Sequence, residues 1–568
     1  MRTLYVAEGK ALPSTSGPWS QAELRVMLGR LNPDNLEEPS KRLYDSIDFY
    51  LSMDTPDEDD QNLEMSLDVI TRIRSYTHTN PESFDHVDKW GVPGYRIPVP
   101  VFAAELSLGF YDRIFLFMDP SIGLVRNFAD PQSLKNAYSL TNIILLPPAQ
   151  TLDTSANTPL RAYTSVGGNG WNVLLGREKV EWGPGHTGNF IFGSQVPYHD
   201  MLRVNAYTDK FKYTFITSFL IHPQNYFTNI ADTSGGAPEV HAFRPHFGQS
   251  SWMNGISVYM HHRFEWRLFE NLGLSVTEGI LYQHPENYLD LRIINPMMIF
   301  HNLYMKQHAN SLLNFDLDWT IVPGVNWYAS VVIDDIALPF IENNPGVPGS
   351  TSPNSIGVLT GLNLVKPEVA GFWAGNVEFA YTDPYLYLRD RGLVKATNGE
   401  QDRTYGLSFM TGIREYGTEE SSRYDLVWLG YRHGGDAIVS SADVQWCSYD
   451  GWGLGGKVFY MAHGVNDILS RWKPVGLGGV SEGAPSKGNN NSDDYFPTMD
   501  GDGNVKPHPT TDSISHTLVI GVNGYYSFAW NIISSAEMDF ITVWNPDNLS
   551  TNPVLFDFQL SLGVTISH

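Results

Sequence analysis

Four charged residues stand in, or at the ends of, strand-like segments that are rich in apolar residues. Arg177 and Glu181 belong to one such segment, and Arg263 and Glu265 belong to another. If apolar solvent surrounds these segments, the charges should face inward and pair, because a charge facing lipid costs several kcal/mol. A paired Arg/Glu network either supports or plugs an interior, or it recognises a sugar through hydrogen bonds. Both interpretations stay open.

A turn-forming stretch follows Glu181. In Trp182-Gly183-Pro184-Gly185, glycine and proline interrupt any strand and force the chain to turn. The turn should place Trp182 and His186 at the mouth of a loop. These two residues are either a structural corner of that loop or a contact for a ligand.

Further candidate residues lie in connections between strand-like segments. Asn295, followed by Pro296, suggests a connection that folds inward and narrows a pore. Tyr385, Tyr387 and Arg389 lie just beyond a strand-like segment. Tyrosine rings beside hydrogen-bonding groups can stack on sugar rings, but these two tyrosines fit an interfacial aromatic girdle equally well.

Short motifs that resemble catalytic or metal sites lack residues that the chemistry needs. Residues 479–483 fit the G-x-S-x-G pattern, but no helix-forming segment follows. Residues 451–457 fit a phosphate-binding loop, but Val458 replaces the Ser or Thr that would hold Mg²⁺. Residues 500–504 resemble the start of a calcium loop without its closing Glu, so weak calcium binding is the alternative there. We therefore expect no enzyme activity, no metal and no cofactor.

Composition narrows the class of protein. The chain has 568 residues and a net charge of −25, which argues against nucleic acid as a partner. Its one cysteine, Cys447, excludes a disulfide framework. No apolar run approaches the eighteen residues of a spanning helix. Charged residues make up only 17% and aromatic residues 13%, which is unusual for a soluble enzyme.

The elements that must position the candidates are alternating strands. In 556–567 every second residue is apolar, from Phe556 to Ile566, and the others are mostly polar. Lipid-facing and lumen-facing residues alternate in this way in outer-membrane barrels. Trp319 and Trp327 flank the turn at 322–324, as an interfacial girdle requires. We predict strands at 172–180, 200–206, 211–221, 256–267, 273–281, 313–321, 325–334, 356–365, 372–382, 404–412, 424–432, 439–449, 453–463, 514–525, 532–543 and 554–567.

The lengths of the connections support a membrane barrel. Every second connection is mostly short, at 207–210, 268–272, 322–324, 366–371, 413–423, 450–452 and 526–531, and the alternate ones are mostly long. Bacterial outer-membrane barrels have short periplasmic turns and long extracellular loops. The predicted fold is therefore an all-β transmembrane barrel of about 16–18 antiparallel strands, with further strands between 97 and 170 that are harder to place.

The N-terminal region has helical patterns instead. Ser20 with Glu23 fits a capping box, and 36–53 and 61–78 are two further candidate helices. The first residues lack the apolar core of a signal peptide, so we expect the signal to have been removed. We predict residues 1–88 to be a periplasmic helical region and residues 89–568 to be an outer-membrane barrel. Its long extracellular loops should include 222–255, 282–312, 335–355 and 464–513.

Several stretches together resemble the Wzi family of capsule-assembly proteins. They are GREKVEWGPGHTGNFIFGSQVPYHDMLRV (176–204), HRFEWRLFENLGLSVTEGILY (262–282), YLDLRIINPMMIFHN (288–302), LLNFDLDWTIVPGVNWYASVVIDDI (312–336), NVEFAYTDPYLYLRD (376–390) and YDLVWLGYRHGGDA (424–437). Their order and spacing, over most of 95–568, carry the likeness. The resemblance implies an eighteen-stranded barrel in the bacterial outer membrane that holds or exports surface polysaccharide.

The expected partners are thus surface polysaccharide and outer-membrane lipid, and we expect a monomer. An outer-membrane porin or channel for small solutes, with an acidic lumen that favours cations, is the alternative function.

Overall fold

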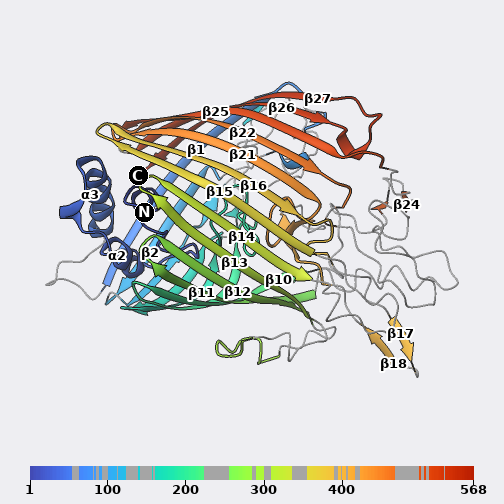
Figure 1. Cartoon of the computed structure of the whole chain (residues 1–568), viewed down its shortest axis with the longest axis horizontal. Coiled ribbons are helices and arrows are strands. Elements are labelled where there is room, and N and C mark those ends of the chain that lie inside the picture. Colours follow the sequence, from blue (N-terminus) through green and yellow to red (C-terminus); the bar gives the residue numbers. More distant parts are fainter. Residues whose placement is uncertain are drawn as a thin grey trace.

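The chain forms one closed antiparallel barrel with a small helical unit at one end (Figure 1). The computed structural model describes residues 1–53, 63–80, 82–84, 89–92, 100–111, 113–122, 138–140, 156–157, 160–222, 255–283, 290–299, 309–335, 355–388, 394–397, 400–403, 407–415, 423–466, 468, 498–499, 505–506, 511–529 and 531–568.

Eighteen of the described strands make the barrel wall, as the sequence predicts. Each pairs with the next, and the first closes the ring against the last, with Ile70 opposite Ser567 and His78 opposite Gln559. In order they are β1 (Leu63–His78), β2 (Phe102–Phe110), β3 (Ile114–Met118), β7 (Ala162–Gly168), β8 (Trp171–Glu178), β9 (His199–Tyr207), β10 (Phe211–His222), β11 (Gly255–Phe269), β12 (Leu272–Tyr282), β13 (Ala309–Val322), β14 (Val325–Asp335), β15 (Ser355–Glu368), β16 (Gly371–Thr382), β21 (Ala437–Ser448), β22 (Trp452–His463), β25 (Ser515–Ala529), β26 (Ile532–Trp544) and β27 (Leu555–Ser567).

The remaining described strands are short. Of these, β4 (Ser121–Ile122) pairs with β2 and with β6 (Ala156–Asn157), and β5 (Tyr138–Leu140) pairs with β1. Separate two-stranded sheets are formed by β17 (Val394–Thr397) with β18 (Glu400–Arg403), by β19 (Met410–Glu415) with β20 (Arg423–Trp428), and by β23 (Thr498–Met499) with β24 (Val505–Lys506).

Alternation along each wall strand separates an outer from an inner face. On β13 the apolar Phe315, Trp319 and Ile321 are exposed, whereas Asp316 and Asp318 are buried. Successive strand residues point to opposite faces, so the polar set lines the lumen and the apolar set faces outward. Trp319 and Trp327 are register partners on the outer face, with ring centroids 6.4 Å apart, which confirms the predicted aromatic pair.

The two ends of the barrel differ as predicted. At one end, which we call the turn end, the wall strands are joined by two or three residues, for example 111–113, 323–324 and 530–531. At the other, the loop end, connections such as 179–198 and 383–436 are long. Outer-membrane barrels place short turns on the periplasmic side. We therefore expect the turn end to face the periplasm.

Two predicted wall strands are wrong. Segments 404–412 and 424–432 do not enter the wall, because β16 pairs directly with β21. Their described parts contribute β19 and β20, which pair with each other and carry side chains of the apolar core inside the barrel. The predicted periplasmic connection 413–423 is wrong with them, because it falls within the connection 383–436 between β16 and β21. Removing two strands together leaves the parity of all other connections unchanged.

The helical unit is smaller than predicted. It contains α1 (Arg2–Ala7), α2 (Gln21–Leu28), the 3-10 turn η1 (Pro33–Asn35) and α3 (Glu38–Met53). The predicted helix at 61–78 is wrong, since β1 occupies Leu63–His78, and the barrel includes strand residues from Leu63 and not only from residue 89. The unit lies at the turn end (Figure 1), where the Gly324 amide donates to the Val6 carbonyl over 2.8 Å. Among the described residues, no helix is long and apolar enough to cross a membrane.

Candidate functional site: the filled lumen

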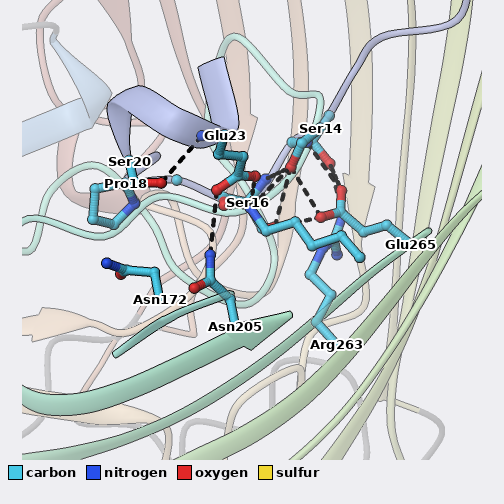
Figure 2. Close-up of polar contacts among 12 residues, drawn as sticks. Ser14, Ser16, Pro18, Ser20, Glu23, Asn172, Asn205, Arg263 and Glu265 are labelled. Carbon is cyan, nitrogen blue, oxygen red and sulfur yellow. Dashed lines mark hydrogen bonds and ion pairs between the residues drawn. The ribbon is translucent and has the colours of Figure 1, made fainter. Parts of the chain in front are cut away.

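A strap of nine residues, 11–19, joins α1 to α2 and is held by the inner wall of the barrel (Figure 2). Glu265, on the inner face of β11, is 2% exposed and accepts hydrogen bonds from this strap. Its donors are the Ser14 hydroxyl at 2.9 Å, the Thr15 amide at 3.0 Å and the Ser16 hydroxyl. The carboxylate of Glu265 therefore fixes three successive strap residues.

Arg263 completes this anchor. The side chain is fully buried, and its guanidinium lies 2.7 Å from Asp316 on β13 and 3.7 Å from Glu265. It also donates to the hydroxyls of Thr277, at 2.9 Å, and Thr15, at 2.7 Å. The inward, paired orientation predicted for Arg263 and Glu265 is confirmed. A role of these residues in sugar recognition stays a prediction.

A second anchor holds the strap near α2. Ser20 caps this helix by accepting from the Glu23 amide at 3.2 Å, as the capping pattern predicts. The Glu23 carboxylate turns instead to the wall, where Lys212 lies 2.6 Å away and Asn205 donates over 3.2 Å. Lys212 also donates to the Ser16 carbonyl over 2.7 Å. Buried charges on the strap and on the wall thus satisfy one another.

The connection 179–198, which we call the inner loop, folds into the lumen beside the strap. Trp182 is 1% exposed and donates from its indole nitrogen to the Gly17 carbonyl over 2.9 Å. Its ring packs edge-on against Phe192, with centroids 4.8 Å apart. The predicted position of Trp182 at a loop mouth is therefore wrong: the glycine and proline turn directs the loop into the barrel, where the indole packs against the strap.

Glu378, on the inner face of β16, holds the far side of the inner loop. Its carboxylate accepts from the backbone amides of His186 and Thr187, each at 2.7 Å, and from the Tyr328 hydroxyl at 2.7 Å. Backbone amides that lack a helix or sheet partner need an acceptor when they are enclosed. A carboxylate on the wall supplies it and fixes the loop at this height.

His186 faces water inside the lumen. Its Nε2 accepts a hydrogen bond from the Arg2 guanidinium over 3.0 Å. Protein atoms surround the rest of the imidazole and disfavour its charged form. This desolvation, together with the Arg2 charge, lowers the pKa of His186 to about 4. Glu181 is exposed and accepts from the Asn189 amide at 3.0 Å. Glu181 and His186 are thus lumenal residues within reach of water.

Described parts of the connection 383–436, at 386–388, 407–413 and 428–431, contribute to an apolar core inside the barrel. Tyr387 is fully buried there, donating from its hydroxyl to the Phe190 carbonyl at 2.7 Å and accepting from the Tyr431 amide at 3.0 Å. It therefore belongs neither to an aromatic girdle nor to an exposed sugar platform, and both predictions for it are wrong. Tyr385 is half-buried against the same core. Arg389 lies outside the described residues.

Arg177 faces outward, against the prediction that it lines the lumen. Its register partner across β9 is Asp200, and its guanidinium contacts that carboxylate at 2.7 and 2.8 Å. The guanidinium also lies 3.9 Å from the ring centroid of Tyr198. Arg177 is the penultimate residue of β8 at the loop end, and charges near the membrane interface cost only ~0–1 kcal/mol. Its position near the loop end explains why an outward charge is tolerated.

Asn295 also lies elsewhere than predicted. Residues 290–299, which we call the outer flap, pack on the outer face of β10–β12 and do not narrow the pore. The Tyr213 hydroxyl donates to the Pro296 carbonyl, and His262 Nε2 lies 2.9 Å from the Met298 carbonyl oxygen. Ile293 is fully buried against the wall. The flap covers polar side chains that would otherwise face lipid.

Sequence reasoning missed several anchors. One of them is Arg203 on β9, which is 1% exposed and donates to the Pro18 carbonyl of the strap. Arg203, Lys212 and Glu378 are all charged residues at inward positions of predicted strands, and that shared feature was the available signal. The strap has no such signal, because its residues ALPSTSGPW show no periodicity. Its position depends on the wall residues that bind it.

Comparisons with known proteins identify the fold. Neither a family model nor a curated protein sequence matches the chain. Among solved structures, Wzi of Escherichia coli aligns over 100% of this chain and 96% of its own, at 13% identity and a TM-score of 0.53. That protein is described as an outer-membrane, carbohydrate-binding β-barrel involved in group 1 capsule assembly. The chain has an outer-membrane barrel fold.

Two further solved structures align less well. OprD of Pseudomonas aeruginosa covers 89% of this chain and 95% of its own, at 8% identity and a TM-score of 0.38. The channel DcaP of Acinetobacter baumannii covers 89% and 98%, at 10% identity and a TM-score of 0.34.

Proposed function

We propose that this protein is a non-enzymatic outer-membrane barrel that binds or anchors surface polysaccharide. The observation that carries the proposal is that the lumen is filled along the inner face of the wall from β8 to β16. The strap, the inner loop and the core around Tyr387 occupy space that a wide diffusion pore would leave open, and buried ion pairs fix them there. The full-length likeness to a carbohydrate-binding barrel agrees with this function.

The proposal includes a family role and a location. The quoted stretches and the fold support a Wzi-like protein in the bacterial outer membrane, monomeric, with its turn end toward the periplasm. Glu181 and His186 are the predicted site residues that reach lumenal water. Binding at exposed surfaces is what an acidic chain with stacking aromatic residues and local cations can provide.

Binding to the cell's own exopolysaccharide tests the function directly. Purified protein in detergent should retain labelled polysaccharide on a pull-down, and a deletion strain should release more polysaccharide into the medium than the parent strain. A strain complemented with the intact gene is the control. Absence of binding together with unchanged surface polysaccharide in the deletion strain would refute the proposal.

A cation channel is the second candidate, and one feature favours it. On the wall from β21 to β27 and β1, inward-facing carboxylates such as Asp443 and Asp68 remain exposed. Water therefore reaches part of the inner wall. Single-channel recording in planar bilayers separates the two functions: a barrel that anchors polysaccharide should show almost no steady conductance, whereas stable, cation-selective steps would favour the channel.

A further inference from the structure

A cavity of about 540 Å³ lies between the helical unit, the strap and the inner loop. Ligand pockets in proteins usually measure ~300–1,000 Å³, so its size suits a small molecule. Strap residues, α1 and the start of the inner loop all contribute to its lining. The polar and aromatic side chains in that lining are Arg2, Ser14, Thr15, Trp19, Lys179 and Glu181.

Two cations in this lining have no carboxylate partner among the residues that the structure describes. Lys179 is exposed, and its ammonium forms no described ion pair. Arg2 donates to the neutral acceptor His186 and to no described carboxylate. The lumenal cations Lys212 and Arg263, by contrast, are each paired with a carboxylate, and the chain carries a net charge of −25. Unpaired cations attract an anionic group.

The same cavity offers a stacking surface and hydroxyl-binding groups. The Trp19 side chain is 42% exposed, although it stands within the strap. An exposed indole can pack against the apolar face of a pyranose ring. Glu181 accepts one hydrogen bond, from Asn189, and a carboxylate has capacity for more, so it can accept from sugar hydroxyls.

We propose that this cavity binds a short acidic saccharide, with its carboxylate at Arg2 and Lys179 and one ring on Trp19. The proposal rests on the proposed function, since it names the kind of saccharide that this barrel recognises. The acidic chain would otherwise repel such a ligand, so binding depends on these two cations.

Titration calorimetry with the full-length protein in detergent tests the assignment. The probes are trigalacturonate, which is acidic, and maltotriose, which is neutral. We expect trigalacturonate to bind at least tenfold more tightly than maltotriose. Lys179→Gln should lower the affinity for trigalacturonate about tenfold, because the ligand carboxylate loses a charged hydrogen-bond donor. Trp19→Ala should weaken both ligands and Trp19→Phe should weaken them less.

Lys366→Gln is the matched control. Lys366 is 75% exposed on the barrel wall near the turn end and pairs with Glu368, so its loss should not change the affinity. Each variant is checked for an unchanged β-sheet circular dichroism spectrum. Equal affinity for the two saccharides would overturn the assignment. So would a Lys179→Gln variant that binds trigalacturonate as tightly as the parent protein does.

The outcome separates this inference from the proposed function. If the cell's polysaccharide is retained but trigalacturonate does not bind, the cavity assignment fails and the proposed function stands. If trigalacturonate binds through Lys179 but the protein retains no surface polysaccharide, the cavity assignment stands and the proposed function fails.

Discussion

Among the wall residues that the structure describes, Glu265 forms the most hydrogen bonds to the strap. It accepts from three successive strap residues and lies beside Arg263. We expect Glu265→Gln to lower the free energy of unfolding by about 3 kcal/mol, since the strap loses the buried carboxylate that accepts its hydrogen bonds, and a hydrogen bond to a charged group contributes ~1.5–3 kcal/mol. Urea unfolding in detergent micelles measures this.

Glu270→Gln is the matched control for Glu265. Glu270 also binds the N-terminal segment, through Lys10 at 3.1 Å, but it is 64% exposed. Exposed ion pairs contribute ~0–1 kcal/mol, so this change should have little effect. Equal losses for the two variants would show that burial of Glu265 is not what stabilises the strap.

The pKa of His186 gives the fold a dependence on pH. Because its pKa is about 4 in the folded chain and near 6.5 when unfolded, the unfolded chain takes up the proton first as pH falls. Stability should therefore fall as pH decreases from 6.5 to 4, and this contribution should level off below 4. The urea midpoint should decrease from pH 7.5 to pH 5 by more in the parent protein than in His186→Gln. Equal decreases in the two proteins would show that His186 is not the cause.

At the scale of elements, the outer flap has one fully buried side chain beside its polar contacts to Tyr213 and His262. Ile293 is fully buried, whereas the neighbouring Leu291 is 72% exposed. Truncating a buried Ile to Ala usually costs ~2–5 kcal/mol, so Ile293→Ala should release the flap and leave the wall strands intact. Trypsin should then cleave after Arg292 faster than in the parent protein. Leu291→Ala is the control, and equally fast cleavage in both variants would refute the packing role.

The sequence predicts a strand correctly where one face of the strand is apolar and the other is polar. The hairpin at Trp319 and Trp327 shows this, because its apolar face points outward and its polar face points into the lumen. Segment 61–78 was mistaken for a helix although Met65, Leu67 and Ile73 are exposed on one face of β1. β19 and β20 also have strand character, but local pattern does not reveal that they lie inside the wall. Alternation predicts a strand, not its partner.

The candidate site was less predictable than the wall, for a physical reason. Arg263 and Glu265 were found because a charge inside a strand must have an inward partner. The strap that they bind comes from a distant part of the chain without periodicity, and only tertiary contact places it. Arg177 and Asn295 were misplaced because the sequence does not show how far a connection reaches over the rim of the barrel.

The molecule as a whole has two unlike walls. From β8 to β16 the inner face is covered by the strap, the inner loop and the core around Tyr387. From β21 through β27 to β1, inward carboxylates such as Asp443 remain in contact with water. The covered wall favours the proposed polysaccharide-binding function, and the wall with exposed carboxylates favours the cation channel. Single-channel conductance of the whole barrel therefore decides between the two functions.

The pairing of β1 with β27 bears on how this molecule is assembled. The strap precedes β1 in the chain, and β27 is the last strand. Bringing these two strands together closes a loop of nearly the whole sequence, which is entropically costly and slow. Once that seam is shut, the strap is enclosed by the wall that binds it. The N-terminal segment must therefore be seated before the seam closes, or enter afterwards through the turn end, and its ion pairs can guide the inner wall into register during biogenesis.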